Sequence, residues 1–222
     1  MPNVKEIFGL EVPNSLPEVC RRERMALLIY DMQVGIASQI KGADGIVAKA
    51  GQVLKAARDA GVRIFFTRHM SLPFELMGAF QFRMAMKWQR VDEPRLVKPW
   101  FLRDSPGFPI VPSLTPRASE AVLDKITMSA FEGTPLQMSL RDCAVSAIAI
   151  VGIALEVGIE PTARHASDLG LIPVIIADAC GSGDAEAAKR SLASLAFEGN
   201  SMITDVAAFI DALARSSNDG RH

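Results

Sequence analysis

Short apolar runs rich in β-branched residues alternate with helix-like segments along most of the chain, and this alternation limits the possible folds more than any other feature. We interpret the runs as buried strands at residues 25–30, 62–67, 121–126, 147–152 and 172–177, with a short sixth strand at 201–203. Strands that are apolar on both faces and alternate with helices are typical of a parallel sheet covered on both sides. The pattern therefore predicts the α/β class, with a doubly wound (Rossmann-like), mostly parallel sheet and helices on both faces.

The segments between the strands have the periodicity of amphipathic helices. In the segment 43–60, apolar residues recur at the i, i+3, i+4 spacing that places them on one helical face. Gly61 follows directly, as a C-cap glycine does. Further helices are predicted at residues 155–169, 185–197 and 206–215.

A length of 222 residues fits one large domain better than two. We predict a single domain over residues 1–222, with a core at 24–215, an insertion at 68–117 and a polar tail at 216–222. The insertion holds seven of the 13 prolines, both tryptophans and a Met/Phe-rich helical patch at 76–88. An insertion of this length is either a lid over a functional site or an extra packing helix that shields a sheet edge.

Composition excludes several classes of function. Lys and Arg total 24 against 25 Asp and Glu, so the net charge is −1 and neither a nucleic-acid partner nor a membrane partner is expected. The most apolar stretch, residues 144–155, is well short of the ~20 residues that a bilayer span needs. Three scattered cysteines form no CxxC pair and no disulfide framework, and the first ten residues have no apolar signal core. We therefore expect a cytoplasmic protein.

Polar residues stand at the expected carboxyl ends of the strands, where open α/β sheets bind ligands. Asp31 follows the first strand, Arg68 and His69 follow the second, and Lys125 ends the third. Asp31 is the first candidate, because partial desolvation at the end of an apolar strand tunes a carboxylate for acid–base chemistry. Each residue alone is better explained as a helix cap or a surface ion pair, so the candidate site is the group.

Three segments carry a family resemblance: RMALLIYDMQ from Arg24, DKITMSAFEGTPL from Asp124, and AIVGIALEVGIEPTARHASDLGLIPVIIADACGS from Ala149. In order and spacing they resemble the isochorismatase-like hydrolase superfamily, which also contains nicotinamidases and other amide hydrolases. The resemblance covers residues 24–209 and implies a parallel sheet with helices on both faces.

The resemblance implies a catalytic Asp at Asp31 and a catalytic Lys at Lys125, but Gly158 stands at the position of the family's cysteine nucleophile. We interpret Cys20, Cys143 and Cys180 as structural. A covalent acyl-enzyme needs a thiolate, and glycine supplies none.

Members with glycine at this position are understood to cleave a vinyl ether: the Asp protonates the enol carbon and water captures the cation. By that resemblance Asp31 is the acid, and Gly158 provides space for substrate and an N–H that holds a carboxylate or a water. The resemblance also implies a cis peptide between Ile153 and Ala154 and a backbone cradle over residues 154–158. The predicted function is therefore a cysteine-independent hydrolase that acts on a small anionic molecule.

The predicted substrate-binding residues are Gln33, Arg68, His69, Phe131, Ile153, Ala154 and Val157. Aromatic residues of the insertion, Trp88 and Trp100 among them, are candidates for an apolar pocket or for core packing. We predict no cofactor and no metal, because His69 is the only histidine at that sheet edge and one histidine does not make a metal site. His165 is interpreted as a packing residue.

Two alternatives stay open at this point. One is an amide or C–N hydrolase in which Asp31 activates water directly. The other is a pseudo-enzyme that binds a ligand without turnover. Besides a small-molecule substrate, the expected partner is a second copy of the chain, in a homodimer or homotetramer, with the apolar insertion as the candidate interface.

Overall fold

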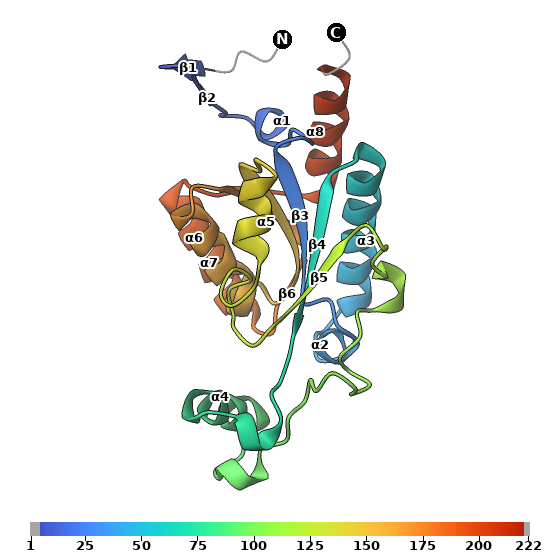
Figure 1. Ribbon diagram of the computed structural model, residues 1–222, viewed down its shortest axis with the longest axis vertical. Helices are drawn as coiled ribbons and strands as arrows, with labels where there is room; N and C mark the ends of the chain where they lie inside the picture. The colour runs from blue at the N-terminus through green and yellow to red at the C-terminus, as the bar shows by residue number, and fades with distance from the viewer. Residues whose placement is uncertain (1–4, 220–222) are drawn as a thin grey trace.

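The computed structural model describes residues 5–219 and confirms the predicted doubly wound fold (Figure 1). Six parallel strands form one sheet in the order β5-β4-β3-β6-β7-β8. Their bounds are Met25–Tyr30 (β3), Arg63–His69 (β4), Ala121–Lys125 (β5), Ala147–Ile153 (β6), Ile172–Gly181 (β7) and Met202–Thr204 (β8). Strand β3 is central and has the predicted bounds, because all six of its residues are buried.

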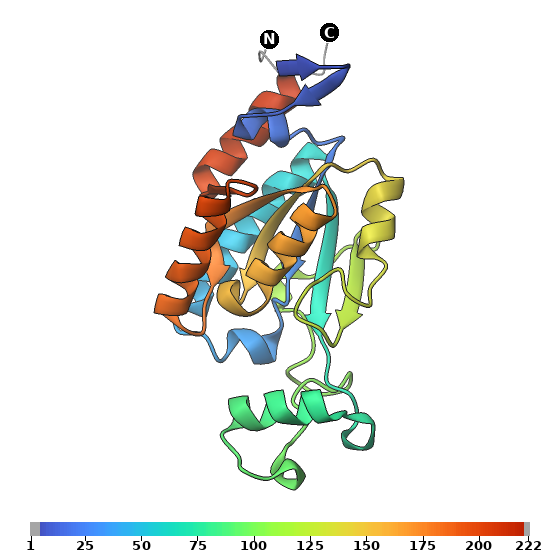
Figure 2. The same cartoon turned by 90° about the vertical axis from the view of Figure 1, so that its left-hand side faces the viewer.

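Helices cover both faces of this sheet (Figures 1 and 2). Helices α3 (Ala43–Ala60) and α8 (Val206–Asp219) pack on one face, and α5 (Leu136–Asp142), α6 (Glu160–Asp168) and α7 (Ala185–Glu198) pack on the other. The buried stripe of α3 consists of Ala50, Val53, Leu54 and Ala57, as its periodicity predicts. Gly61 ends this helix in the left-handed conformation, with φ of 75°.

The structure differs from the sequence prediction at several element boundaries. The predicted helix 155–169 is divided, with a π-helical turn at Leu155–Ile159 before α6. The last helix, predicted to end at residue 215, continues to Asp219 as α8, so residues 216–219 of the predicted polar tail are helical, while 220–222 lie outside the described residues. The short helices α1 (Leu16–Val19), α2 (Val34–Ala37) and α5 and the hairpin of β1 (Lys5–Ile7) and β2 (Leu10–Val12) were not predicted. Elements of three to seven residues are too short for a periodic signal.

The insertion stands beyond the carboxyl ends of the strands, away from the body of the sheet (Figure 2). It contains α4 (Ala79–Gln89), preceded by a 3₁₀ turn at Phe74–Leu76 and followed by another at Pro94–Leu96. We call residues 70–107 the arm. No residue of α4 is buried. Its place at the carboxyl ends favours the lid alternative over a helix that shields a sheet edge. Within the described residues, no helix is both long and apolar enough to cross a bilayer.

Candidate active site

A cavity of about 260 Å³ opens at the carboxyl ends of β3 and β6. The chain runs outward from β3 through β4 to β5 and then returns to the other side of β3 as β6. This is the switch point at which doubly wound sheets bind ligands. The cavity is lined by Tyr30, Asp31, Ile36, Gln39, Ile40, His69, Trp88, Trp100, Phe101, Met128, Ile153, Ala154, Val157, Gly158 and Gly183.

Asp31, which lines this cavity, forms a buried ion pair with Lys125, which lies outside the lining. The Lys125 ammonium donates to Asp31 Oδ2 at 2.7 Å, and the Thr67 hydroxyl donates to Asp31 Oδ1 at 2.7 Å. Both carboxylate oxygens of Asp31 therefore accept a hydrogen bond. The structure brings together the two residues that the sequence placed at the centre of the site.

The remaining hydrogen bonds of Lys125 fix its ammonium in place. Its Nζ also donates to Tyr30 Oη at 2.9 Å and to the Thr127 carbonyl at 3.1 Å, so all three donors are used. Lys125 ends β5, and its side chain reaches past β4 to the end of β3 with no exposed surface. A buried ion pair is tolerated only when its hydrogen-bonding groups are satisfied in this way.

Gly158 lines the cavity, but the space left by its missing side chain is filled by Tyr30, which corrects the predicted room for substrate. A Cβ on Gly158 would overlap the Tyr30 hydroxyl and Cζ and would lie 2.6 Å from Cε1. The Gly158 N–H donates to the Ala154 carbonyl at 3.0 Å, as do those of Val157 and Ile159 at 3.3 and 3.2 Å. Of the predicted cradle at residues 154–158, the N–H groups of Val157 and Gly158 are therefore already used within the π-helical turn, which contradicts their predicted role in binding an anion.

The peptide bond between Ile153 and Ala154 is cis, as the resemblance implies. Ile153, Ala154 and Val157 all line the cavity, where the sequence analysis placed them. Gly152, one residue earlier, pairs with Tyr30 and has a φ of 136°. A Cβ there would lie 2.8 Å from the Tyr30 backbone nitrogen, so glycine permits the close approach of β6 to β3.

His69 lines the cavity, but Gln33 does not. Burial lowers the pKa of His69 to about 4, against the opposing effect of Asp31, so the ring is neutral at neutral pH. Its ring lies edge-on to Phe101, with centroids 6.0 Å apart. The Gln33 amide is fully buried: its Nε2 donates to the His69 and Phe108 carbonyls, and its Oε1 accepts from His69 N–H. Gln33 therefore ties two loops together, and its predicted contact with substrate is wrong.

Arg68 and Phe131 also lie outside the cavity. The Arg68 guanidinium binds both oxygens of Asp124, at 2.7 and 3.2 Å, and stacks on Phe108. Phe131 is buried in the core beside His165. His165 Nδ1 lies 2.9 Å from Ser129 Oγ, which agrees with its interpretation as a packing residue. The two predicted binding roles are wrong because each side chain already has a structural partner.

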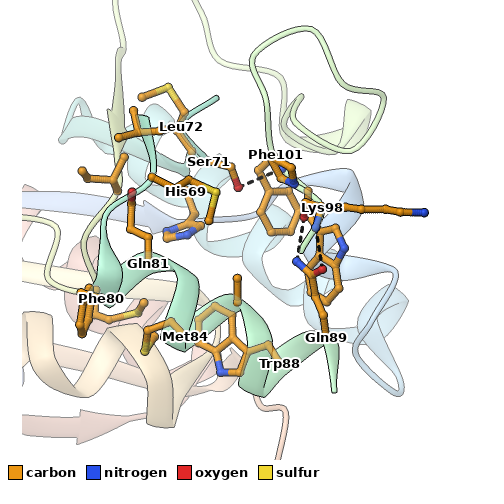
Figure 3. Close-up of a pocket in the computed structure, with 17 residues that line it drawn as sticks. His69, Ser71, Leu72, Phe80, Gln81, Met84, Trp88, Gln89, Lys98 and Phe101 are labelled. Atoms are coloured by element: carbon orange, nitrogen blue, oxygen red, sulfur yellow. Dashed lines mark hydrogen bonds between the residues drawn. The ribbon is translucent and has the colours of Figure 1, made fainter. Parts of the chain in front are cut away.

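The arm supplies the apolar wall of the cavity, through Trp88, Trp100 and Phe101. A second, narrower cavity of about 70 Å³ continues from it between α4 and the segment after β4 (Figure 3). The two share five residues: His69, Trp88, Trp100, Phe101 and Met128. Gln89 also lines this narrower cavity, and its amide exchanges two hydrogen bonds with the Lys98 backbone, at 2.7 and 2.9 Å (Figure 3).

The sequence analysis missed Tyr30, Ile36, Gln39, Ile40, Phe101, Met128 and Gly183 as lining residues. Tyr30 carried a signal, since it is the last residue of an otherwise aliphatic strand and directly precedes Asp31. The others lie on loops and short helices whose positions no periodicity indicates.

The three cysteines lie away from the cavity lining. Burial raises the pKa of both Cys20 and Cys180 to about 12, which leaves each thiol protonated and inert at neutral pH. Within residues 5–219, no group of three or more His, Cys, Asp or Glu side chains is arranged to hold a metal ion.

Comparisons with known proteins agree with this architecture. Residues 25–208 match the isochorismatase domain family, and the chain therefore belongs to that family. A relative in Escherichia coli O157:H7, the uncharacterized isochorismatase family protein YecD, is 30% identical over 75% of this chain and 85% of its own length. The ureidoacrylate amidohydrolase RutB of Serratia proteamaculans is 28% identical over 71% of this chain and 69% of its own.

Solved structures show the same fold. A cysteine hydrolase from Pseudomonas syringae superposes with a TM-score of 0.75 at 24% identity, over 88% of this chain and 94% of its own. An isochorismatase family protein from Burkholderia thailandensis superposes with a TM-score of 0.70 at 26% identity, over 86% and 96%. The chain is an isochorismatase-like hydrolase by family.

Proposed function

We propose that this protein hydrolyses a C–N bond in a small, largely uncharged molecule, with Asp31 as general base and without a covalent intermediate. The observation that carries this proposal is the Asp31–Lys125 pair, which lies at a cavity whose described lining contains no cysteine. Without a thiol, water is the nucleophile that remains. Asp31 is the only carboxylate in that lining and the natural acceptor of the water's proton.

The hydrogen bonds of Asp31 support a base rather than an acid. Both of its oxygens accept hydrogen bonds, one of them from a charged ammonium. An ionised carboxylate is an acceptor only, so this environment suits the form that takes a proton. The ureidoacrylate amidohydrolase of Serratia, by its name, acts on a C–N bond.

The character of the cavity wall supports an uncharged substrate and argues against the anionic one that the sequence suggested. No arginine stands in the described lining, His69 is neutral, and the Lys125 ammonium already uses all its donors. Trp88, Trp100 and Phe101 instead offer flat apolar surfaces to a planar group.

Vinyl-ether cleavage with Asp31 as the acid is the second candidate. It is supported by Gly158, since this reaction, like direct attack by water, needs no thiol. It requires the carboxyl of Asp31 to carry a proton in the resting enzyme, against the pattern of donors around it.

The exposed apolar residues of the arm support assembly of the chain into a homodimer or homotetramer. Leu76 and Phe80 are each 67% exposed, and Leu96 is 53% exposed. Light scattering on the purified protein measures the mass directly. A monomer at micromolar concentration contradicts this part of the proposal. A cytoplasmic location stays a prediction, in keeping with three free cysteines.

The test of the function is a hydrolysis screen by mass spectrometry. The panel contains acetanilides, small amides, ureas, cyclic imides and isochorismate-type vinyl ethers, each with the wild type and Asp31→Asn. We expect turnover of a C–N substrate that falls by about 10²–10⁴-fold in Asp31→Asn. Turnover of the vinyl ethers alone selects the second candidate. If no compound of the panel is hydrolysed, and if ligand binding is unchanged by Asp31→Asn, the result supports the non-catalytic alternative.

A further inference from the structure

The phenol of Tyr30 contacts Gly158 and Lys125 and borders the cavity. Tyr30 is the last residue of β3 and the single tyrosine among 222 residues. Its side chain lines the cavity although only 2% of the residue is exposed. Its hydroxyl lies in the volume that a side chain at position 158 would fill. Gly158 and Tyr30 therefore act as a pair that puts an O–H group into the site.

The Tyr30 hydroxyl belongs to the same hydrogen-bond network as Asp31. It accepts from Lys125 Nζ at 2.9 Å and donates to the Met128 carbonyl. The ammonium also lies 4.3 Å from the centroid of the Tyr30 ring. Lys125 thus contacts both Tyr30 and Asp31 from behind the cavity wall, and the described lining itself contains no ammonium and no guanidinium.

Tyr30 holds a proton at neutral pH, which a proton donor requires. Burial, together with the neighbouring carboxylate of Asp31, raises the pKa of Tyr30 well above its usual value. The phenol therefore carries its proton at neutral pH and is a poor nucleophile. A hydroxyl proton can turn from one acceptor to another without movement of the ring.

We propose that Tyr30 is a catalytic residue, the general acid that protonates the leaving nitrogen of the substrate. This inference rests on the proposed C–N hydrolysis. Water attacks the carbonyl carbon and gives a proton to Asp31. The C–N bond then breaks while the Tyr30 hydroxyl gives its proton to the departing nitrogen, which leaves a phenolate beside the Lys125 ammonium. Lys125 passes a proton to the phenolate and receives one from Asp31, so the enzyme returns to its starting state and one water is consumed.

The decisive experiment compares the wild type with Tyr30→Phe on acetanilides whose ring substituents run from p-methoxy to p-nitro. Phe keeps the ring that fills the space beside Gly158 and removes only the hydroxyl. A poor leaving group needs the acid, and a good one does not. We expect kcat of Tyr30→Phe to fall by about 10²–10⁴-fold on the p-methoxy compound and by less than about tenfold on the p-nitro compound, with KM little changed.

Two controls separate an acid from a merely structural hydroxyl. Thr134→Val removes a hydroxyl-to-carbonyl hydrogen bond of the same kind, to Ala130, outside the cavity. It should lower the melting temperature as Tyr30→Phe does and leave the leaving-group dependence unaltered. Because Tyr30 is the only tyrosine, ultraviolet titration of the phenolate reports on this residue alone. The proposal expects no phenolate until well above pH ~10.

The outcomes of these experiments distinguish a failure of the acid role of Tyr30 from a failure of the proposed C–N hydrolysis. A uniform loss of kcat across the acetanilides, or no loss, overturns the acid role of Tyr30 and leaves the proposed C–N hydrolysis standing. Phenolate formation near neutral pH also overturns it, since an ionised phenol has no proton to give. Absence of turnover by the wild type on every C–N substrate overturns the proposed function and this inference with it.

Discussion

The two walls of the cavity differ in polarity and in burial. The sheet wall presents Tyr30 and Asp31 to the cavity, and both are buried. Behind them, Thr67 and Lys125 hold these side chains by hydrogen bonds. The arm wall is apolar: Trp88 and Trp100 are partly exposed and Phe101 is buried. Helix α4, which carries Trp88, has no buried residue and stands off the body of the sheet (Figure 2). Substitutions in the first wall should therefore affect stability and chemistry, and substitutions in the second should affect binding.

The largest effect on stability is expected for Lys125→Met. Removal of one member of a buried ion pair leaves the other uncompensated and typically costs about 3–5 kcal/mol. The Asp31 carboxylate would keep only Thr67 as its side-chain donor. The free energy of unfolding, measured by urea denaturation, checks this.

The double variant Asp31→Asn with Lys125→Met sharpens the result. It removes both charges of this ion pair and should be more stable than Lys125→Met alone, while remaining inactive. If the two variants are equally unstable, packing of the Lys125 side chain rather than its charge supports this wall.

Acid should destabilise the protein through His69, on the same wall. The pKa of this residue is about 4 in the folded state and about 6.5 when unfolded, because burial disfavours the charged ring. The unfolded chain therefore binds more protons between these values, so stability is fully present above pH ~6.5 and is lost as pH falls towards 4. The expected loss is about 3 kcal/mol.

His69→Leu isolates this contribution, because leucine is also apolar and cannot be charged. Urea denaturation at pH 7 and at pH 4 should show a smaller difference for His69→Leu than for the wild type. An identical pH dependence for the two proteins would assign the acid sensitivity to carboxylates elsewhere.

Gly158→Ala tests whether glycine is needed for Tyr30. The new Cβ would overlap the Tyr30 hydroxyl, and overpacking of this kind costs about 1–3 kcal/mol. Tyr30→Val should restore the stability of Gly158→Ala, because the smaller side chain vacates the contested volume. A double-mutant cycle of unfolding free energies gives this coupling directly. Additive effects would show that the two side chains do not compete for the same space.

This coupling also marks what the sequence could and could not predict. The bounds of β3 and the positions of Asp31 and Lys125 follow from a buried apolar run and from the rule that ligands bind at carboxyl ends. The sequence shows that position 158 has no side chain and so leaves space. It does not show that Tyr30 fills this space, because the contact joins residues distant in the chain and depends on the close approach of β6 to β3 at Gly152.

The wrong predictions of substrate-binding side chains share one cause. Arg68 and Gln33 have the chemistry of ligand-binding groups, but the structure gives them internal partners, Asp124 for the first and the backbone at His69 and Phe108 for the second. Composition and order along the chain indicate which groups can bind a ligand. They do not indicate which of those groups fold into pairs among themselves.

The smallest effect on stability is expected in the arm. Trp88 lines both cavities, yet it is 43% exposed and belongs to a helix with no buried residue. Trp88→Ala should therefore change the free energy of unfolding by no more than about 0.5 kcal/mol. It should raise KM by about tenfold through lost apolar contact, about 1.4 kcal/mol, with kcat nearly unchanged. The control is Phe80→Ala on the same helix, which lines only the narrower cavity and should affect KM less. A kcat that falls with KM unchanged would instead place Trp88 in the chemical step, and the separation between a wall for chemistry and a wall for binding would then fail.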